Sequence, residues 1–286
     1  MNRASARNLE PSKWRYLREF FDWRGLVRNL TRHRELIVTM TWRDFSSRYR
    51  GSLGGLLWSL IQPLVMMVIY TIVFSLFLKV RFSTDASPFT FSVYLLCGLL
   101  AWNAFNEGLS RSKDIIRANI NLVKRVVFPL EILPLNAALT ASIHQLVGFL
   151  LLIPLAWIVS KNLYWTLFFV PVIFFIQLLF AIGLNWIVAS LAVYLPDVGQ
   201  VVSLILGVWF FLTPIFYPED IVPPQATIFL EINPMARIVR LYREAFMLGS
   251  LPTVESLLGT LIFCLLTFLL GYFWFTHSKK GFADVL

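Results

Sequence analysis

Arginine is the residue type with the clearest capacity for ligand chemistry in this sequence. Arg43, Arg48 and Arg50 lie close together just before the first long apolar segment. A planar guanidinium group donates two parallel hydrogen bonds to two oxygens of one phosphate, which a lysine ammonium group cannot do. These arginines are therefore a candidate site for a phosphate-bearing lipid. The alternative, that they only set membrane topology and contact ordinary anionic lipid, stays open.

Aromatic side chains form the second set of candidates. The chain has 26 Phe, 10 Trp and 9 Tyr, and several recur at helical spacing within apolar segments. Sugar rings stack on aromatic planes, and hydroxyl groups meet the polar edges of Tyr and Trp. The stripes predict a pathway for carbohydrate, whereas helix packing is an equally good explanation for any single residue. The candidate channel residues are Tyr70, Phe74, Phe77, Tyr94, Trp102, Phe105, Trp209 and Phe216.

The sequence contains no pattern for catalysis, so we expect neither an enzyme nor a metal site. The three histidines, His33, His144 and His277, are far apart, and His144 is better explained as a hydrogen-bonding core residue. Cys97 and Cys264 lie inside apolar segments, where cysteine is usually a small packing residue. There is also no G-x-x-x-x-G-K-[ST] loop, so this chain lacks the usual ATP-binding motif.

Composition indicates which kind of element must hold these residues. Of the 286 residues, 58% are hydrophobic and only 14% are charged, yet the net charge is +9. A soluble monomer has too little polar surface to cover so much apolar side chain. The apolar segments are too long for barrel strands and do not alternate in polarity. We therefore predict an all-α integral membrane protein.

A membrane helix needs roughly 20 apolar residues. Six segments meet this requirement, and they predict spans near 55–78, 89–110, 132–159, 164–194, 198–217 and 255–277. Most Lys and Arg residues lie before the first span, between spans two and three, and after span six. The positive-inside rule then places both termini in the cytoplasm. Without ionisable groups at the centre of a span, a proton- or sodium-coupled transporter is disfavoured.

Three segments outside the spans are long enough to have a role. Residues 1–53 form a predicted cytoplasmic region, in which 14–30 has the apolar stripe of an amphipathic interface helix. A second helix near 31–49 follows, and Gly51, Gly54 and Gly55 allow a bend before the transmembrane domain, 54–286. Between spans two and three, 114–124 predicts a short amphipathic helix, which either docks another subunit or is a solvated loop.

The third segment outside the predicted spans is the external segment 218–254. Asn233 and Pro234 are a good N-cap and first residue for a helix over 235–247, which is too short and too charged to cross a membrane. We expect this helix to dip partway into the bilayer or to lie flat on it, and to gate the external mouth.

Three runs resemble a known family. RDFSSRYRGSLGGLLWSLIQPL (43–64), NINLVKRVVFPLEILPL (119–135), and TPIFYP (213–218) followed by INP (232–234) are similar to the membrane subunits of polysaccharide ABC exporters. These Wzm-like, ABC-2-type permeases export O-antigen, capsule or teichoic acid chains. The resemblance implies a homodimer that works with two P-loop ATPase subunits, which bind ATP and Mg²⁺. It also implies a location in the bacterial inner membrane and a substrate linked to undecaprenyl pyrophosphate, with membrane lipid but no nucleic acid as a partner.

The resemblance assigns roles to the segments as well. Arg43, Arg48 and Arg50 would bind the lipid pyrophosphate, and 14–30 would be the interface helix. The coupling helix to the ATPase would use Asp114, Ile115, Ile116, Asn119, Ile120, Asn121, Leu122 and Lys124. The short helices between spans five and six would be the external gate, with Tyr217, Arg237, Arg240 and Tyr242.

Two alternatives remain at this point. An ABC-2 permease for a drug or small lipid would have the same spans, although the interface helix and the aromatic stripes favour a glycan. A membrane-embedded enzyme acting on lipid-linked sugars would need a cluster of acid, base or metal-binding residues at one membrane face, and the sequence has none.

Overall fold

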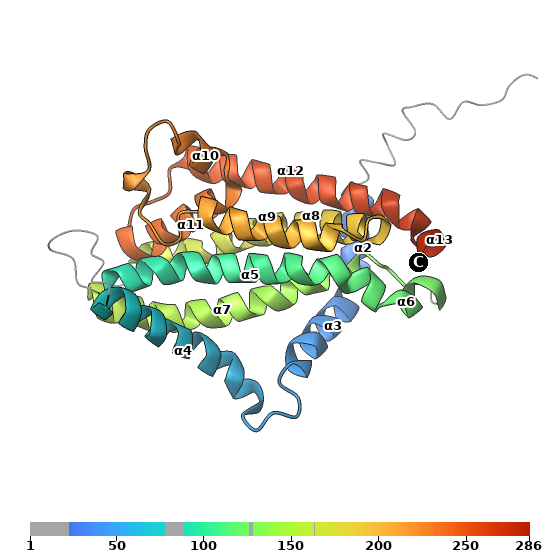
Figure 1. Ribbon diagram of the computed structural model, residues 1–286, viewed down its shortest axis with the longest axis horizontal. Helices are drawn as coiled ribbons and strands as arrows, with labels where there is room; N and C mark the ends of the chain where they lie inside the picture. Colours follow the sequence, from blue (N-terminus) through green and yellow to red (C-terminus); the bar gives the residue numbers. More distant parts are fainter. Residues whose placement is uncertain (1–22, 78–88, 126–127, 163) are drawn as a thin grey trace, which may run out of the picture.

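The computed structural model describes residues 23–77, 89–125, 128–162 and 164–286. Throughout this part of the chain the regular elements are helices, which confirms the all-α prediction (Figure 1). The predicted interface helix lies partly outside the described residues, which include 23–30 but not 14–22. Its later part is helical, as α2 (Trp23–Arg32). The predicted second helix is α3 (Arg34–Ser47).

Four segments are long and apolar enough to cross a membrane: Gly55–Phe74, Ile132–Ser160, Trp165–Tyr194 and Val254–Val285. They contain α4 (Trp58–Thr71), α7 (Ile132–Ser160), α8 (Val170–Tyr194) and α12 (Val254–Ser278), close to four of the six predicted spans. The predicted second span lies in α5 (Thr90–Ala118), where Asn103, Asn106 and Glu107 lower the mean hydropathy. The predicted fifth span corresponds to α9 (Val198–Leu212), a shorter apolar helix.

The helices form a bundle in which α5 packs against α7 and α8, and α8 packs against α12. The α8–α12 crossing depends on two glycines, Gly183 and Gly271, which face each other. A Cβ atom on Gly183 would lie 2.5 Å from the Thr267 carbonyl oxygen and 2.7 Å from the Phe268 Cα atom. Small residues let transmembrane backbones approach this closely. Without them α12 would have to move away from α8.

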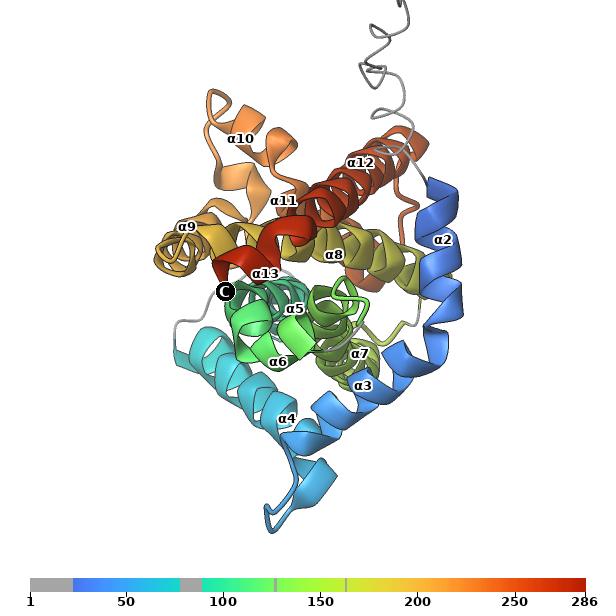
Figure 2. The same ribbon diagram turned by 90° about the vertical axis from the view of Figure 1, so that its right-hand side faces the viewer.

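The connection between α3 and α4 turns sharply at glycines, as predicted. Gly51 and Gly55 have φ angles of 84° and 48°, in the left-handed region that glycine adopts without steric cost. Both ribbon views show α3 and α4 meeting at this corner, away from the bundle, with α4 diverging from α5 and α7 (Figures 1 and 2). Much of α4 is exposed, including Leu64, Val65 and Val68.

The two ends of the bundle carry different short helices. At one end lie α2, α6 (Ile120–Arg125) and α13 (Phe282–Val285), and at the other lies α10 (Thr227–Ile232) (Figure 1). The predicted helix in 218–254 is present as α11 (Pro234–Arg243), followed by a π-helical turn over Glu244–Leu248. The Asn233 side chain accepts hydrogen bonds from the backbone N–H groups of Met235 and Ala236, so the predicted N-cap is confirmed.

The predicted single helix over 114–124 is wrong. Residues 114–118 are the last turn of α5, the helix breaks at Asn119, and α6 begins at Ile120. The Asn119 side chain donates to the Ile115 carbonyl oxygen at 2.8 Å, which satisfies a free acceptor at the end of α5. The amphipathic pattern of 114–124 did not reveal this break, because the apolar spacing continues across it.

Candidate functional site

A cavity of about 350 Å³ opens between α4 and the α5–α7 pair. Its position follows from the divergence of α4 at the glycine corner. One part of its wall is polar, with Gln62, Asn103 and Gln145, and another part is apolar, with Met66 and Leu99. Amide groups can donate to and accept from hydroxyl groups, so this lining suits a polar ligand with an apolar face.

Charged residues lie at one side of this cavity. Arg48, in the turn after α3, forms an ion pair with Glu107 of α5. The other oxygen of that carboxylate lies 3.2 Å from the Nδ1 atom of His144 on α7. The Nε2 atom of His144 is 3.0 Å from the Tyr49 hydroxyl group. This cluster therefore joins the segment after α3 to both α5 and α7.

The two hydrogen bonds of His144, with Glu107 and with Tyr49, are consistent with one tautomer of its ring. A His144 ring protonated on Nδ1 donates to Glu107 and accepts from Tyr49 through Nε2. Burial, which outweighs the opposing effect of Arg48, raises the pKa of Tyr49, so its hydroxyl group keeps the proton that it donates. Arg48 retains about one third of its side-chain exposure and can exchange its partner. The arrangement can hold an anionic oxygen at Arg48 in place of Glu107.

The three arginines predicted to act together are not together. Arg48 lines the cavity, whereas Arg43 and Arg50 do not, and neither forms an ion pair with a residue that the structure describes. The neighbour of Arg43 has a separate role: Asp44 accepts from Arg111 of α5 at 2.5 Å and from Thr140 of α7 at 3.2 Å. Two adjacent carboxylate contacts thus hold α3 against the same pair of helices.

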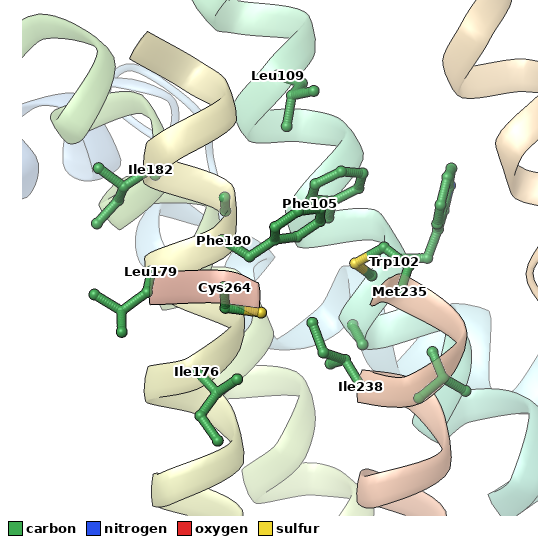
Figure 3. Close-up of a cluster of buried hydrophobic side chains, with 14 of the residues drawn as sticks. Trp102, Phe105, Leu109, Ile176, Leu179, Phe180, Ile182, Met235, Ile238 and Cys264 are labelled. Atoms are coloured by element: carbon green, nitrogen blue, oxygen red, sulfur yellow. The ribbon is translucent and has the colours of Figure 1, made fainter. Parts of the chain in front are cut away.

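The candidate channel aromatics fall into two groups. Tyr70 lines the cavity, and Phe77 is 74% exposed. In contrast, Figure 3 shows Trp102 and Phe105 of α5 among buried side chains of α8 and α11. The Phe105 ring stacks on Phe180 at 5.4 Å and is fully buried, so within this chain it packs helices together. Trp209 meets both rings of α5 edge-on, with its centroid 5.2 Å from Phe105 and 6.2 Å from Trp102.

The external segment holds an arginine in an unusual setting. Arg243, at the end of α11, is 5% exposed and has its guanidinium carbon 3.3 Å from the centroid of the Tyr94 ring. It donates to the Tyr94 hydroxyl oxygen at 2.7 Å and to the Ile215 carbonyl oxygen at 3.1 Å. Burial lowers the pKa of Arg243. The Tyr94 hydroxyl group in turn donates to the Tyr217 carbonyl oxygen at 3.0 Å. One buried cation thereby ties α5, the segment after α9 and α11 together.

The candidate gate residues occupy different environments. Tyr242 is fully buried and donates to Gln177 of α8 at 2.9 Å, so α11 packs against the bundle through this side chain. Arg240 pairs with Glu219 and Glu231, and these carboxylates, against the effect of burial, raise its pKa. Arg240 and Arg243 line an outer cavity of about 550 Å³ together with Glu219, Asp220 and Glu244. Arg237 lies near Glu231, and the Tyr217 hydroxyl group donates to the Phe211 carbonyl oxygen.

The candidate coupling residues are only partly available at the surface. Ile116 is 1% exposed and packs inside the chain. Asp114, Asn121 and Lys124 are exposed, whereas Ile115, Asn119, Ile120 and Leu122 are half-buried. A partner at this end of the bundle would therefore meet α6 and the polar side of the last turn of α5.

Glu107 is a residue of this site that no sequence pattern singled out. Spacing could not pair Glu107 with Arg48, because 59 residues separate them. A general rule could have indicated Glu107 as a candidate, because an ionisable residue in an apolar helix needs a partner.

Comparisons with known proteins agree with one another. The family model described as "ABC-2 type transporter" matches residues 35–247. The chain is 28% identical to the O-antigen export system permease protein RfbA of Myxococcus xanthus, over 82% of this chain and 88% of the relative. It is 29% identical to the protein of the same name from Klebsiella pneumoniae, over 88% and 95%. The polysialic acid transport protein KpsM of Escherichia coli is 27% identical, over 80% and 88%.

Proposed function

Since the chain belongs to the ABC-2 type transporter family, we propose that it is the permease subunit of an exporter that moves a polysaccharide across the bacterial inner membrane. The similarity to relatives named as O-antigen export permeases covers most of both chains. These names favour a glycan over the drug or small lipid considered as an alternative. As in those relatives, the role is transport and not catalysis.

The observation that carries the mechanism is the cavity between α4 and the α5–α7 pair. Its Arg48 offers a guanidinium fork for the pyrophosphate of an undecaprenyl-linked glycan. Its amide side chains and Tyr70 offer hydrogen bonds and a ring face to the attached sugar. On this proposal the pyrophosphate displaces Glu107 from Arg48, and Glu107 retains its hydrogen bond with His144. Arg43 and Arg50 would attract the headgroup before it enters.

The proposed topology has six spans with both termini in the cytoplasm. The supporting features for α5 are its length of 29 residues and its place beside α7 and α8 in the bundle. α9 is about 22 Å long, and the chain continues past its end before α10. The end with α2, α6 and α13 would be cytoplasmic, and the end with α10 would be external.

The proposed assembly is a homodimer with two P-loop ATPase subunits, which bind ATP and Mg²⁺. The exposed apolar faces of α4 and α9, such as Leu64 and Leu204, supply surface for pairing. Phe77 and Phe74 of the first span and Phe216 would line the path between the copies, while α11 closes its external mouth. α6 is the proposed contact with the ATPase.

Arg48→Lys tests the proposal, because it retains the positive charge but loses the planar fork. We expect surface polysaccharide to fall about tenfold at unchanged permease abundance. Arg34→Lys, the same exchange at an exposed position outside the cavity, is the matched control and should export normally. Export by Arg48→Lys at the level of the control would contradict the proposed headgroup site.

A further inference from the structure

A second cavity, of about 340 Å³, lies where α2 meets the end of α12. It shares no lining residue with the cavity that contains Arg48, and it belongs to different elements. The side chains that matter are Arg28, Asn29 and Arg32 from α2, Glu131 just before α7, and Thr276 and Lys279 from the end of α12. We call this the α2–α12 cavity.

One carboxylate is built into the wall of this cavity. Glu131 is only 3% exposed, and both of its oxygens are already engaged. One accepts from the Asn29 side chain, and the other accepts from the Lys279 ammonium group at 2.9 Å. Glu131 therefore fixes the position of Lys279.

The two arginines of the cavity have no such partner. Neither Arg28 nor Arg32 forms an ion pair or a side-chain hydrogen bond with any residue in the described ranges. They are four residues apart on α2, so they project from the same side of the helix, where like charges destabilise it. With Lys279, three cations face this cavity against one carboxylate. The cavity therefore attracts an anion.

The surroundings indicate which anion fits. Two guanidinium forks match the oxygens of a phosphate group, and the Lys279 ammonium group, which gives one hydrogen bond to Glu131, has further N–H donors. The wall also contains Tyr272 and Phe273 of α12, a helix apolar enough to cross a membrane. A phosphate that carries acyl chains could lay them along α12, and basic pockets beside transmembrane helices bind lipid headgroups in this way.

We propose that the α2–α12 cavity binds the phosphate group of an anionic membrane phospholipid, and that this lipid holds α2 against the end of α12. The site is separate from the Arg48 cavity and does not depend on the proposed substrate. Its ligand is a resident lipid, whose phosphate neutralises Arg28 and Arg32.

The test uses the purified full chain in detergent, titrated with dioleoyl phosphatidylglycerol or dioleoyl phosphatidylcholine, with bound lipid counted by native mass spectrometry. We expect the anionic lipid to bind more tightly. The double variant Arg28→Gln, Arg32→Gln should weaken phosphatidylglycerol binding about thirtyfold. The matched control Arg34→Gln, Lys280→Gln removes the same charge outside the cavity and should change the affinity less than threefold. Equal effects of the two double variants would overturn the proposal.

Two further arms identify the source of the phosphate and guard against misfolding. Farnesyl pyrophosphate represents an isoprenyl pyrophosphate headgroup, and if it displaces phosphatidylglycerol at lower concentration, the site belongs to the substrate and not to a resident phospholipid. The variant Arg28→Lys, Arg32→Lys retains the charge and the fold. Intermediate affinity in this variant supports recognition by the guanidinium forks, and affinity equal to that of the wild type overturns it.

Discussion

Arg48 and Glu107 form an ion pair that spans the cavity between the α3–α4 corner and α5. No local sequence pattern predicts this pair, since one member comes from an irregular turn and the other from the middle of a long helix. His144 and Tyr49 complete its hydrogen bonds. The pair is therefore both a structural link and the point at which an anionic ligand could compete.

Glu107→Gln tests whether an anionic ligand competes with Glu107 for Arg48, because it removes the competing carboxylate. The amide retains the shape of the side chain but no longer pairs electrostatically with Arg48, so an incoming phosphate has less to displace. We expect the variant to bind farnesyl pyrophosphate severalfold more tightly than the wild type, measured by isothermal titration of the purified chain. Asn103→Asp changes a neighbouring cavity residue in the opposite electrostatic direction and should weaken that binding. Unchanged affinity in Glu107→Gln would show that Arg48 does not donate to the bound anion.

Tyr94→Phe should destabilise the external segment, because it leaves a hydrogen-bonding position of the buried Arg243 and the Tyr217 carbonyl oxygen without a partner. Loss of such buried hydrogen bonds costs about 1–3 kcal/mol. Thermal unfolding of the purified protein, followed by tryptophan fluorescence, measures the change. Tyr164→Phe removes a hydroxyl group that forms no hydrogen bond with any residue in the described ranges, and it serves as the control. A midpoint for Tyr94→Phe equal to that of the control would contradict this role of Tyr94.

Gly183→Ala should separate α8 from α12, since its Cβ atom would meet the backbone of Thr267 and Phe268 at 2.5–2.7 Å. Backbone atoms cannot rotate away, so the helices must shift, and we expect a loss of about 2–4 kcal/mol, in the range of overpacked cores. Gly207→Ala in α9 adds the same methyl group where no atom lies within 4 Å, and should leave stability unchanged or slightly higher. Similar expression and detergent stability for the two variants would refute the close-packing argument.

Ile120→Asp should disturb the proposed contact of α6 with the ATPase. The variant places a charge on a half-buried residue at the start of α6 while leaving the buried Ile116 in place. We expect ATPase activity in the co-purified complex to lose most of its dependence on this chain. Leu195→Asp, at an exposed position in the α8–α9 connection, introduces the same charge as a control. Normal coupling in Ile120→Asp would exclude α6 as the docking element.

Glu244 gives a prediction of pH dependence. Burial, together with the nearby Glu219, raises the pKa of its carboxyl group, and one of its oxygens is buried without a hydrogen-bond partner in the described structure. A raised pKa in the folded state means that the ionised form is the costly one, so stability should increase as pH falls through that pKa. Glu244→Gln should raise the unfolding midpoint by a few degrees at pH 7, and the difference should shrink toward pH 4.5. A difference that is independent of pH would assign the effect to packing.

Local or periodic signals in the sequence were enough to predict several of the elements. A membrane helix requires only a long apolar segment, so α4, α7, α8 and α12 lie almost where predicted. The N-cap of α11 depends on two adjacent residues, Asn233 and Pro234, and is likewise a local signal. The break at Asn119 was missed, because an amphipathic spacing that continues across a break looks like one helix.

Which residues share a site, in contrast, depends on how the helices pack against one another. Arg43, Arg48 and Arg50 are neighbours in sequence, yet only Arg48 of the three lines the cavity between α4 and the α5–α7 pair. Trp102 and Phe105 have the same helical spacing as the exposed or cavity-lining aromatics, yet they pack between helices. Spacing fixes the face of a helix on which a side chain lies, but the neighbouring helices fix what that face meets. Those neighbours are set by contacts between distant residues, such as Gly183 with Gly271 and Arg243 with Tyr94, which no local pattern encodes.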